Sequence, residues 1–541
     1  MAHGSDGFWR GGMATNTGRG RAPVGPGHHA ARPGPPPSGG GRPIVRRGLK
    51  AIFGPAWSPG AGQLREAGTT GTASRTFPSE RDMQNGFMRF TALALGVAGA
   101  LAMGNVHASG FQIRENSVKN LGRANSGTAV AKNDASVVSN NPAAMANFSR
   151  NAVQVDLTDI NLDAEFTGSG KTAIGTPLNG SNGGDPGDPT VVPALAAVFP
   201  LSGALDKVTV GVSVDAPFGL KTEYDPNWVG RYNAIKSDVK TVDLNLSAAI
   251  AVTDRFSIGG GLILQRADVT LSNAIDFGTQ LCAGSGNPAN CASPVFPFHP
   301  QQNDGSVEVS GDDTSIGWRV GLQWRPTDAL SIGVAHRSEI DHDLSGTAEF
   351  TIPGNVAASP SSAAPGAPSI GTVFRDGSIT APLTTPSVTT VSVEYDFTPQ
   401  FRLMADYQAT DWHSLKAVQI FRSGGGVLGN EPFQWKDTNF YSLGGEWDLS
   451  PQWTLRAGIA KDESPTNDTY RTPRLPDKDR KIFTIGATWN VSDAFSVDAA
   501  YMRINVDDPT INNIHSSSQS TLTGKFSANA NLFGVAAQYR F

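Results

Sequence analysis

The side chains that could do chemistry in this chain of 541 residues are few and widely scattered. Ser338 and His342 are four residues apart and would share one face of a strand, but no third residue is placed to orient the histidine as a catalytic base. The nine histidines and two cysteines show no metal-ligand spacing, and the sequence contains no glycine-rich phosphate-binding loop. We therefore expect no catalytic residue, no metal site and no cofactor.

The two cysteines, Cys282 and Cys291, are too few for a disulfide-rich scaffold. They lie nine residues apart in a segment rich in Gly, Asn and Pro. This spacing predicts one disulfide that pins a single loop, in an oxidising compartment. The alternative is two unpaired thiols in a loop.

The composition favours an all-β scaffold for these side chains. Hydrophobic residues make up 39% of the chain, charged residues 17%, and there are 62 glycines, as expected for many strands joined by turns. Outside residues 83–108 there is no apolar run of about 18 residues, which excludes a helical membrane protein. A net charge of −5 argues against a nucleic-acid partner.

The N-terminal part of the chain has the features of an export signal that begins late. Residues 1–82 are rich in Pro, Gly and Arg without periodicity, so we expect disorder there. Residues 83–108 contain a basic start, a short apolar run and a cleavage site ending at Ala108, as in a secretory signal peptide. We expect translation to start at Met83 or Met88, which would make residues 1–82 a mis-assigned extension. The alternative is a long basic export leader.

From residue 151 to residue 541 the hydrophobic pattern has a period of two. Apolar and polar residues alternate in the stretches 241–250, 391–397, 401–408 and 495–501. Alternation over about ten residues is typical of transmembrane β-strands, whose outer face meets lipid. Lipid cannot satisfy an open sheet edge, so we expect the sheet to close into a barrel. A soluble β-sandwich or propeller is the alternative.

The connections between strands predict their number. Six tight turns have Ser, Thr or Pro followed by turn-forming residues: Leu201–Ala204, Thr253–Phe256, Pro326–Ala329, Thr398–Phe401, Ser450–Trp453 and Ser492–Phe495. Between them lie longer irregular stretches at 167–190, 271–305 and 351–377. Short turns on one side and long loops on the other are typical of outer-membrane barrels. Six short turns, with both termini on the periplasmic side, predict fourteen antiparallel strands.

Residues 109–150 differ from the rest, being rich in Ala, Asn, Ser and Gly and poor in large apolar residues. Such a segment cannot build a core of its own. Its place between the export signal and the predicted strands indicates a small, partly helical plug inside the barrel. At the other end the chain stops on an aromatic residue, Phe541, after an alternating strand, which resembles the signal read by bacterial outer-membrane assembly machinery.

Several short motifs together resemble the FadL/TodX family of outer-membrane transporters. The matching motifs are Gly110–Gln112, Leu121–Ala124, Asn141–Ala143, Pro217–Leu220, Trp228–Tyr232, His336–Glu339, Asp462–Pro465 and Pro476–Arg480. No single motif is specific, but they occur in order across residues 109–541. The resemblance implies a fourteen-stranded barrel closed by an N-terminal hatch, and passive uptake of long-chain fatty acids or aromatic hydrocarbons.

The resemblance also implies roles for particular residues. It implies a lateral gate at Pro217, Phe218, Gly219 and Leu220, because the family's wall opens at an inward kink in the third strand. Pro217 suits such a kink, since it has no N–H for the ladder. The alternative for this motif is an ordinary strand end.

The resemblance also implies which residues anchor the hatch and which residue binds the carboxylate of the ligand. Asn141, Pro142 and Ala143 would anchor the hatch, although Asn-Pro is also a common start of a turn. Arg266 aligns with the basic residue of the family's ligand pocket. Counting by twos from Phe256, however, places Arg266 on the outward face, unless a bulge at 259–261 reverses the alternation.

We therefore expect a passive outer-membrane transporter for hydrophobic small molecules, with long-chain fatty acids as the first substrate class. Uptake of aromatic hydrocarbons is the alternative, and an outer-membrane barrel lipase built on Ser338 and His342 is a more distant one. A general porin would not need a plug of about forty residues. The expected partners are the ligand, outer-membrane lipid and the assembly machinery, and the family precedent favours a monomer.

Overall fold

The computed structural model describes residues 110–541. The predicted extension (1–82) and signal peptide (83–108) lie outside these residues. Within the described part of the chain, no helix has the length and hydropathy needed to cross a membrane.

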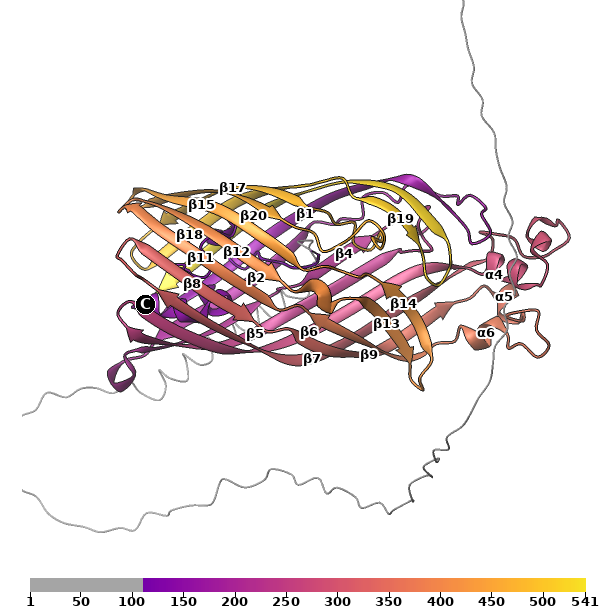
Figure 1. Ribbon diagram of the computed structural model, residues 1–541, viewed down its shortest axis with the longest axis horizontal. Helices are drawn as coiled ribbons and strands as arrows, with labels where there is room; N and C mark the ends of the chain where they lie inside the picture. The colour runs from indigo at the N-terminus through magenta and orange to yellow at the C-terminus, as the bar shows by residue number, and fades with distance from the viewer. Residues whose placement is uncertain (1–109) are drawn as a thin grey trace, which may run out of the picture. The chain divides into compact units, whose positions relative to one another are not determined.

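One antiparallel sheet contains every named strand of residues 110–541 (Figure 1). Its strands are β1 (Ala152–Lys171), β2 (Thr190–Pro200), β3 (Val208–Asp215), β4 (Gly219–Glu223), β5 (Lys236–Thr253), β6 (Phe256–Asp276), β7 (Asp304–Trp324), β8 (Leu330–Arg337), β9 (Ile340–Thr351), β10 (Gly377–Thr385), β11 (Val388–Thr398), β12 (Phe401–Thr410), β13 (Ala417–Arg422), β14 (Val427–Pro432), β15 (Thr438–Ser450), β16 (Trp453–Asp462), β17 (Arg480–Asn490), β18 (Phe495–Val506), β19 (Thr510–Ile514) and β20 (Thr521–Arg540). The helical segments are α2 (Val118–Leu121), α3 (Val137–Asn140), η1 (Pro142–Asn147), η2 (Gly203–Leu205), α4 (Phe277–Gly284), η3 (Pro288–Ala292), α5 (Gly354–Ala357), α6 (Ile370–Val373) and η4 (Trp412–Ser414).

The sheet closes on itself, because β20 pairs with β1 from Ala152↔Arg540 to Lys171↔Thr521. Six barrel strands are each interrupted once: β3/β4, β8/β9, β10/β11, β12/β13, β14/β15 and β18/β19. The result is the closed barrel of fourteen antiparallel strands that the turn count predicted.

The alternation in sequence becomes the two faces of the wall. On β5 and β6, Leu246 and Leu262 are exposed on the outside, whereas Asn245 and Gln265 are buried inside. Apolar residues outward and polar residues inward are what a bilayer around the barrel requires. Aromatic residues such as Trp324 and Trp453 lie outward near the short turns, where their amphipathic rings suit the membrane interface.

Short and long connections separate to opposite ends of the barrel. In Figure 1, α4, α5 and α6 gather at the end opposite the chain's C-terminus. The long connection from β6 to β7 contains α4 and η3, which a disulfide between Cys282 and Cys291 joins. We take the long-loop end as extracellular and the short-turn end as periplasmic, following the usual asymmetry of outer-membrane barrels.

Residues 110–150, which we call the hatch segment, pack against the inner face of the wall. At eight positions of this contact the wall residue is an inward-facing glycine. A Cβ added to any of these eight glycines would overlap atoms of the hatch segment. The contacts are Gly211 with Met145, Gly259 with Ala143, Gly321 with Asn141, Gly333 with Ala129, Gly444 and Gly458 with Arg123, Gly486 with Gly122, and Gly534 with Val118. The missing side chains let the two backbones approach closely.

Candidate functional site

The wall is broken within its third strand, between β3 and β4. Asp215 lies opposite Asp243 of β5, and Gly219 lies opposite Lys240. Three residues therefore separate the paired positions on the broken strand, whereas two separate them on β5. This single extra residue is a bulge. In an unbroken strand, Asp215 and Leu220 would face opposite sides because they are five residues apart. Beyond the bulge the alternation is reversed, and both side chains are buried inside the barrel.

The break removes a ladder contact on the side facing β2. The β2–β3 ladder runs from Leu195↔Val214 to Pro200↔Thr209, and within residues 110–541 β4 is paired in the sheet with β5 alone. The hatch segment covers this position: the Ile113 amide donates to the Pro217 carbonyl at 2.7 Å, and the Gly219 amide donates to the Phe111 carbonyl at 2.7 Å. The residues predicted as a gate thus lie at a gap in the β-ladder between the third strand and β2, and the hatch segment bonds to this position from inside.

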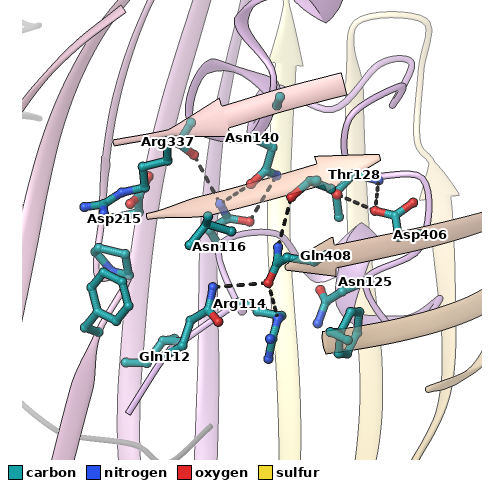
Figure 2. A pocket seen from close by; sticks show the side chains of 18 of the residues that line it. Gln112, Arg114, Asn116, Asn125, Thr128, Asn140, Asp215, Arg337, Asp406 and Gln408 are labelled. Carbon is teal, nitrogen blue, oxygen red and sulfur yellow. Dashed lines mark hydrogen bonds between the residues drawn. The ribbon is translucent and has the colours of Figure 1, made fainter. Parts of the chain in front are cut away.

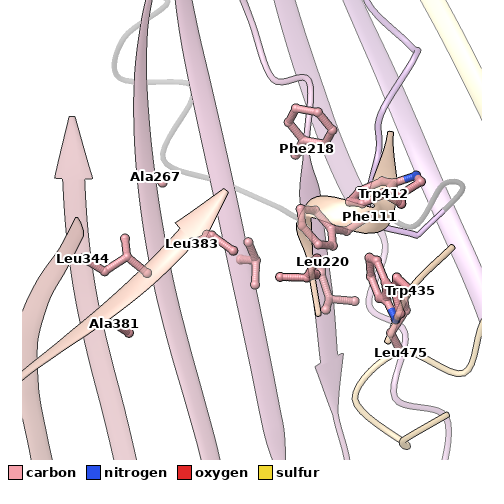
Figure 3. Close-up of a cluster of buried hydrophobic side chains, with 12 residues drawn as sticks. Phe111, Phe218, Leu220, Ala267, Leu344, Ala381, Leu383, Trp412, Trp435 and Leu475 are labelled. Atoms are coloured by element: carbon pink, nitrogen blue, oxygen red, sulfur yellow. The ribbon is translucent and has the colours of Figure 1, made fainter. Parts of the chain in front are cut away.

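An aromatic cluster lies at this gap (Figure 3). The ring of Phe111 is 5.8 Å from that of Phe218 and 4.9 Å from that of Trp412. Trp412 also packs against Trp435, with ring centroids 5.0 Å apart. The aromatic partners of Phe111 were not predicted, because they come from the distant segments that carry η4 and the start of β15.

Above Phe111, toward the long loops, lies an apolar cavity of about 80 Å³. Aliphatic and aromatic side chains line almost all of it, among them Leu220, Leu344, Leu383 and Trp435 (Figure 3). Among residues 110–541, Arg474 is the only charged residue in this lining. We call this space the apolar pocket.

The apolar pocket opens toward the loops through a larger cavity of about 430 Å³. The two spaces share the lining residues Leu271, Val309, Val418, Ile420 and Arg474. The two cavities therefore adjoin, and the side chains that they share are apolar except for Arg474.

On the other side of the aromatic cluster is a polar cavity of about 90 Å³, which we call the polar pocket (Figure 2). Gln112 and Arg114 both donate to Gln408 Oε1, at 3.2 and 2.8 Å, and Arg114 pairs with Asp462 at 2.9 Å. Phe218 lines the polar pocket and Phe111 lines the apolar pocket. These two rings therefore separate the pockets.

Arg266 does not line either pocket. Its side chain is 51% exposed on the outer face, where it pairs with Asp268 at 2.9 Å and with Asp312 at 3.2 Å. The glycines at 259–261 introduce no bulge, since their pairing with both β5 and β7 is continuous. The assignment of Arg266 as the ligand's carboxylate partner is therefore corrected: the period of two is unbroken and points the side chain outward.

This placement yields a prediction. We expect Arg266→Ala to leave ligand uptake unchanged, because the side chain meets only exposed carboxylates on the outer face. Exposed ion pairs contribute about 0–1 kcal/mol, so barrel stability should change little. Uptake of labelled fatty acid into vesicles containing each protein would test this, and a large loss would contradict the outward assignment.

Asn141, Pro142 and Ala143 lie where the hatch segment meets the wall. Asn141 Nδ2 donates to the carbonyls of Ala129 at 2.7 Å and Leu322 of β7 at 3.1 Å. Ser257 of β6 donates to the Ala143 carbonyl at 2.9 Å. These bonds join the hatch segment to two neighbouring strands.

Ser338 and His342 do not form a reactive pair. Ser338 Oγ accepts from the Trp318 amide at 3.0 Å, while His342 is held between Asp313 at 2.9 Å and Gln265 at 3.0 Å. Each side chain is thus occupied by a different partner.

One group of possible metal ligands was missed by the sequence analysis. Asp411, His413 and Asp437 offer ligand atoms that lie within 4.8 Å of one another. His413 and Asp437 already bond at 2.7 Å and are more than half exposed, so we assign them no metal. Their approach depends on the pairing of segments far apart in the sequence.

A charged cluster holds the hatch segment to the periplasmic half of the wall. The Glu446 carboxylate on β15 accepts from Arg123 of the hatch segment, from Arg402 and, at 2.8 Å, from Arg456. These groups border a cavity of about 1000 Å³ that reaches the short turns. Glu446 is therefore the shared partner of three guanidinium groups.

The loop between β16 and β17 contacts the start of the hatch segment. The Gly110 amide donates to Asp477 Oδ2 at 3.0 Å, and Asp477 also accepts from Ser464 and Arg480. Burial raises the pKa of the Asp477 carboxyl, against the lowering effect of Arg480. The motifs Asp462–Pro465 and Pro476–Arg480 thus lie beside the start of the hatch segment.

Comparison with known proteins places this geometry among related barrels. Residues 99–541 match the family described as outer membrane protein transport protein (OMPP1/FadL/TodX). The chain is 28% identical over 420 residues to a long-chain fatty acid transport protein of Escherichia coli, covering 76% of this chain and 91% of that protein. A FadL homologue of Pseudomonas aeruginosa superposes with a TM-score of 0.73 at 28% identity, covering 80% of this chain and 99% of that one. The toluene transporter TodX of Pseudomonas putida shares the fold, with a TM-score of 0.56 at 17% identity, covering 80% of this chain and 99% of that one.

Proposed function

Because the chain belongs to the OMPP1/FadL/TodX family of outer-membrane transport proteins, we propose that it takes up long-chain fatty acids and releases them sideways into the bilayer. The protein is an outer-membrane transporter of hydrophobic molecules and not an enzyme. The observation that carries the proposal is the apolar pocket, which lies between the loop-side cavity and the break between β3 and β4.

Lateral release follows from the chemistry of an alkyl chain. Each methylene that leaves water gains about 0.8 kcal/mol, so an acyl chain in the apolar pocket would lose this on entering an aqueous pore. In this proposal, the gap in the ladder beside Pro217 is where the ligand leaves the barrel toward lipid. The hatch segment closes it through two backbone hydrogen bonds, which would have to break or shift during release.

We further propose that the hatch segment is a plug that stays in the barrel during transport. Its contacts with wall glycines, the bonds of Asn141 and the Glu446 cluster all hold it in place. Asn141, Pro142 and Ala143 would act as its anchor. We also propose that the protein works as a monomer and that the strand ending at Phe541 is read by the assembly machinery.

Aromatic hydrocarbons are the second candidate substrate class. The apolar pocket favours them as well, since Arg474 is its one charged lining residue and is already bonded to Glu431 at 3.0 Å. A small neutral hydrocarbon needs no basic partner and would fill the same space.

Uptake by outer-membrane vesicles separates the two classes. Labelled oleate and labelled toluene would be supplied to vesicles with and without the protein. We expect uptake of oleate that depends on the protein and no protein-dependent entry of toluene. Protein-dependent entry of toluene without oleate uptake would instead make the protein a hydrocarbon channel.

A further inference from the structure

Two arginines lie side by side on the inner wall of the polar pocket. Arg319 of β7 and Arg337 of β8 are directly opposite in the β-ladder, and both are buried and line the polar pocket. Like charges at opposite positions of neighbouring strands repel each other. This arrangement therefore calls for an anion nearby.

Arg337 has a hydrogen-bonded carboxylate partner. Arg319 has none within residues 110–541, although the carboxylates of Asp215 and Asp243 lie close enough to attract its charge. Arg337 Nη2 pairs with Asp243 at 3.0 Å. Arg319 is 6% exposed, and its Nε and Nη1 have no hydrogen-bond partner within the described part of the chain. A buried guanidinium without a partner is strongly unfavourable, and an unsatisfied buried polar group needs an explanation.

The other arginines that line the two pockets each pair with a carboxylate, although Arg337 Nε also has no hydrogen-bond partner within residues 110–541. Arg474 pairs with Glu431 and donates to the Lys236 carbonyl at 3.1 Å. Arg114 donates to Gln408 and pairs with Asp462. Among the pocket-lining arginines of residues 110–541, Arg319 therefore has the donors best placed to receive a ligand.

The carboxylates closest to this pair are already engaged. Asp243 accepts from Arg337 and, at 2.6 Å, from Gln265. Asp215 accepts from Asn245 at 3.2 Å. Neither forms an ion pair with Arg319, so two donors of this pocket-lining guanidinium remain without a partner in the described residues.

We infer that Arg319 receives the carboxylate of the ligand, so that the molecule reaches the gap in the wall with its head group leading. The acyl chain would still lie in the apolar pocket while the head group passes Phe111 and Phe218 into the polar pocket. A guanidinium and a carboxylate form strong, charge-assisted hydrogen bonds. The polar pocket thus selects for an amphiphile with a terminal carboxylate over a neutral molecule of the same length. This inference rests on the proposed function.

Binding of an acid and of its ester tests the inference directly. Brominated stearate quenches tryptophan fluorescence, and Trp412 and Trp435 lie at the junction of the two pockets. We would titrate the purified protein in detergent with brominated stearate and with its methyl ester. For Arg319→Met we expect the dissociation constant of the acid to rise roughly tenfold to a hundredfold, while that of the ester stays unchanged.

Two control variants distinguish the loss of the positive charge at Arg319 from a general effect of substitution on the barrel. Arg266→Met removes an outward guanidinium from the neighbouring strand and should change neither dissociation constant. Arg319→Lys retains the positive charge and should keep a preference for the acid over the ester. Heat-modifiable mobility in gel electrophoresis shows whether each barrel has folded.

The outcomes are distinguishable from failure of the proposed function. If Arg319→Met weakens acid and ester equally, or weakens neither, the inference is wrong. If Arg319→Met does not fold, loss of the acid preference in Arg319→Lys overturns the inference and retention supports it. If the wild-type protein binds neither acid nor ester, the proposed fatty-acid function itself fails.

Discussion

Deleting Pro217 is expected to abolish ligand uptake while leaving the barrel folded and its apolar pocket able to bind. The strand from β3 to β4 carries one residue more than β5 between the paired positions 215↔243 and 219↔240. Removing one residue restores an unbroken period of two, with Asp215, Phe218 and Leu220 all pointing inward. The straightened strand can then extend its ladder toward β2 and close the gap.

Two further variants make this test specific. Pro217→Ala keeps the extra residue, and we expect it to retain uptake. Deletion of Gly425, which has open space around it in the connection between β13 and β14, controls for the loss of one residue. The measurement is labelled oleate uptake by vesicles, with fluorescence quenching by brominated stearate as the readout of binding. Uptake at the wild-type rate after deletion of Pro217 would rule out release through this gap.

Replacing Glu446 with alanine is expected to cause the largest loss of stability. Removing one partner of a buried ion pair costs about 3–5 kcal/mol, because the opposite charge is left uncompensated. Arg123, Arg402 and Arg456 all depend on this carboxylate. Arg402 retains Asp448 and Arg456 retains Asp498, but Arg123 loses its ion pair with the wall.

The free energy of unfolding in detergent, measured by denaturant titration, gives the size of the effect. Asp328→Ala is the matched control, because it also removes a carboxylate from an arginine but at a position where the aspartate side chain is 97% exposed. We expect that control to cost at most about 1 kcal/mol. Planar-bilayer currents should show openings for Glu446→Ala that the wild-type protein lacks, since its hatch segment is less firmly held. Equal losses in the two variants would show that the Glu446 cluster does not stabilise the hatch segment.

The barrel could be predicted from the sequence because every second residue of a membrane-spanning strand faces lipid and has to be apolar. Strand number followed from the six tight turns, and the strand break followed from a proline that has no N–H to pair. At Arg266 the period of two and the family resemblance disagreed, and the structure follows the period.

The sequence could not predict which residues of different strands and loops lie next to each other inside the barrel. Alternation is unchanged when one strand slides by two residues along its neighbour, so it does not specify which inward residues become opposite. The pairing of Arg319 with Arg337, and the approach of Trp412 to Phe111, depend on this register. No signal within either segment alone reveals them.

The contacts between the hatch segment and the wall glycines have a consequence for how the protein is made. Val118 and Gly122, near the start of the described residues, pack against Gly534 of β20 and Gly486 of β17. Those strands are synthesised last, and β20 must also join β1 before the wall is complete. The hatch segment therefore gains its contacts with β17 and β20 only as the barrel closes, and we expect the closing wall to enclose it.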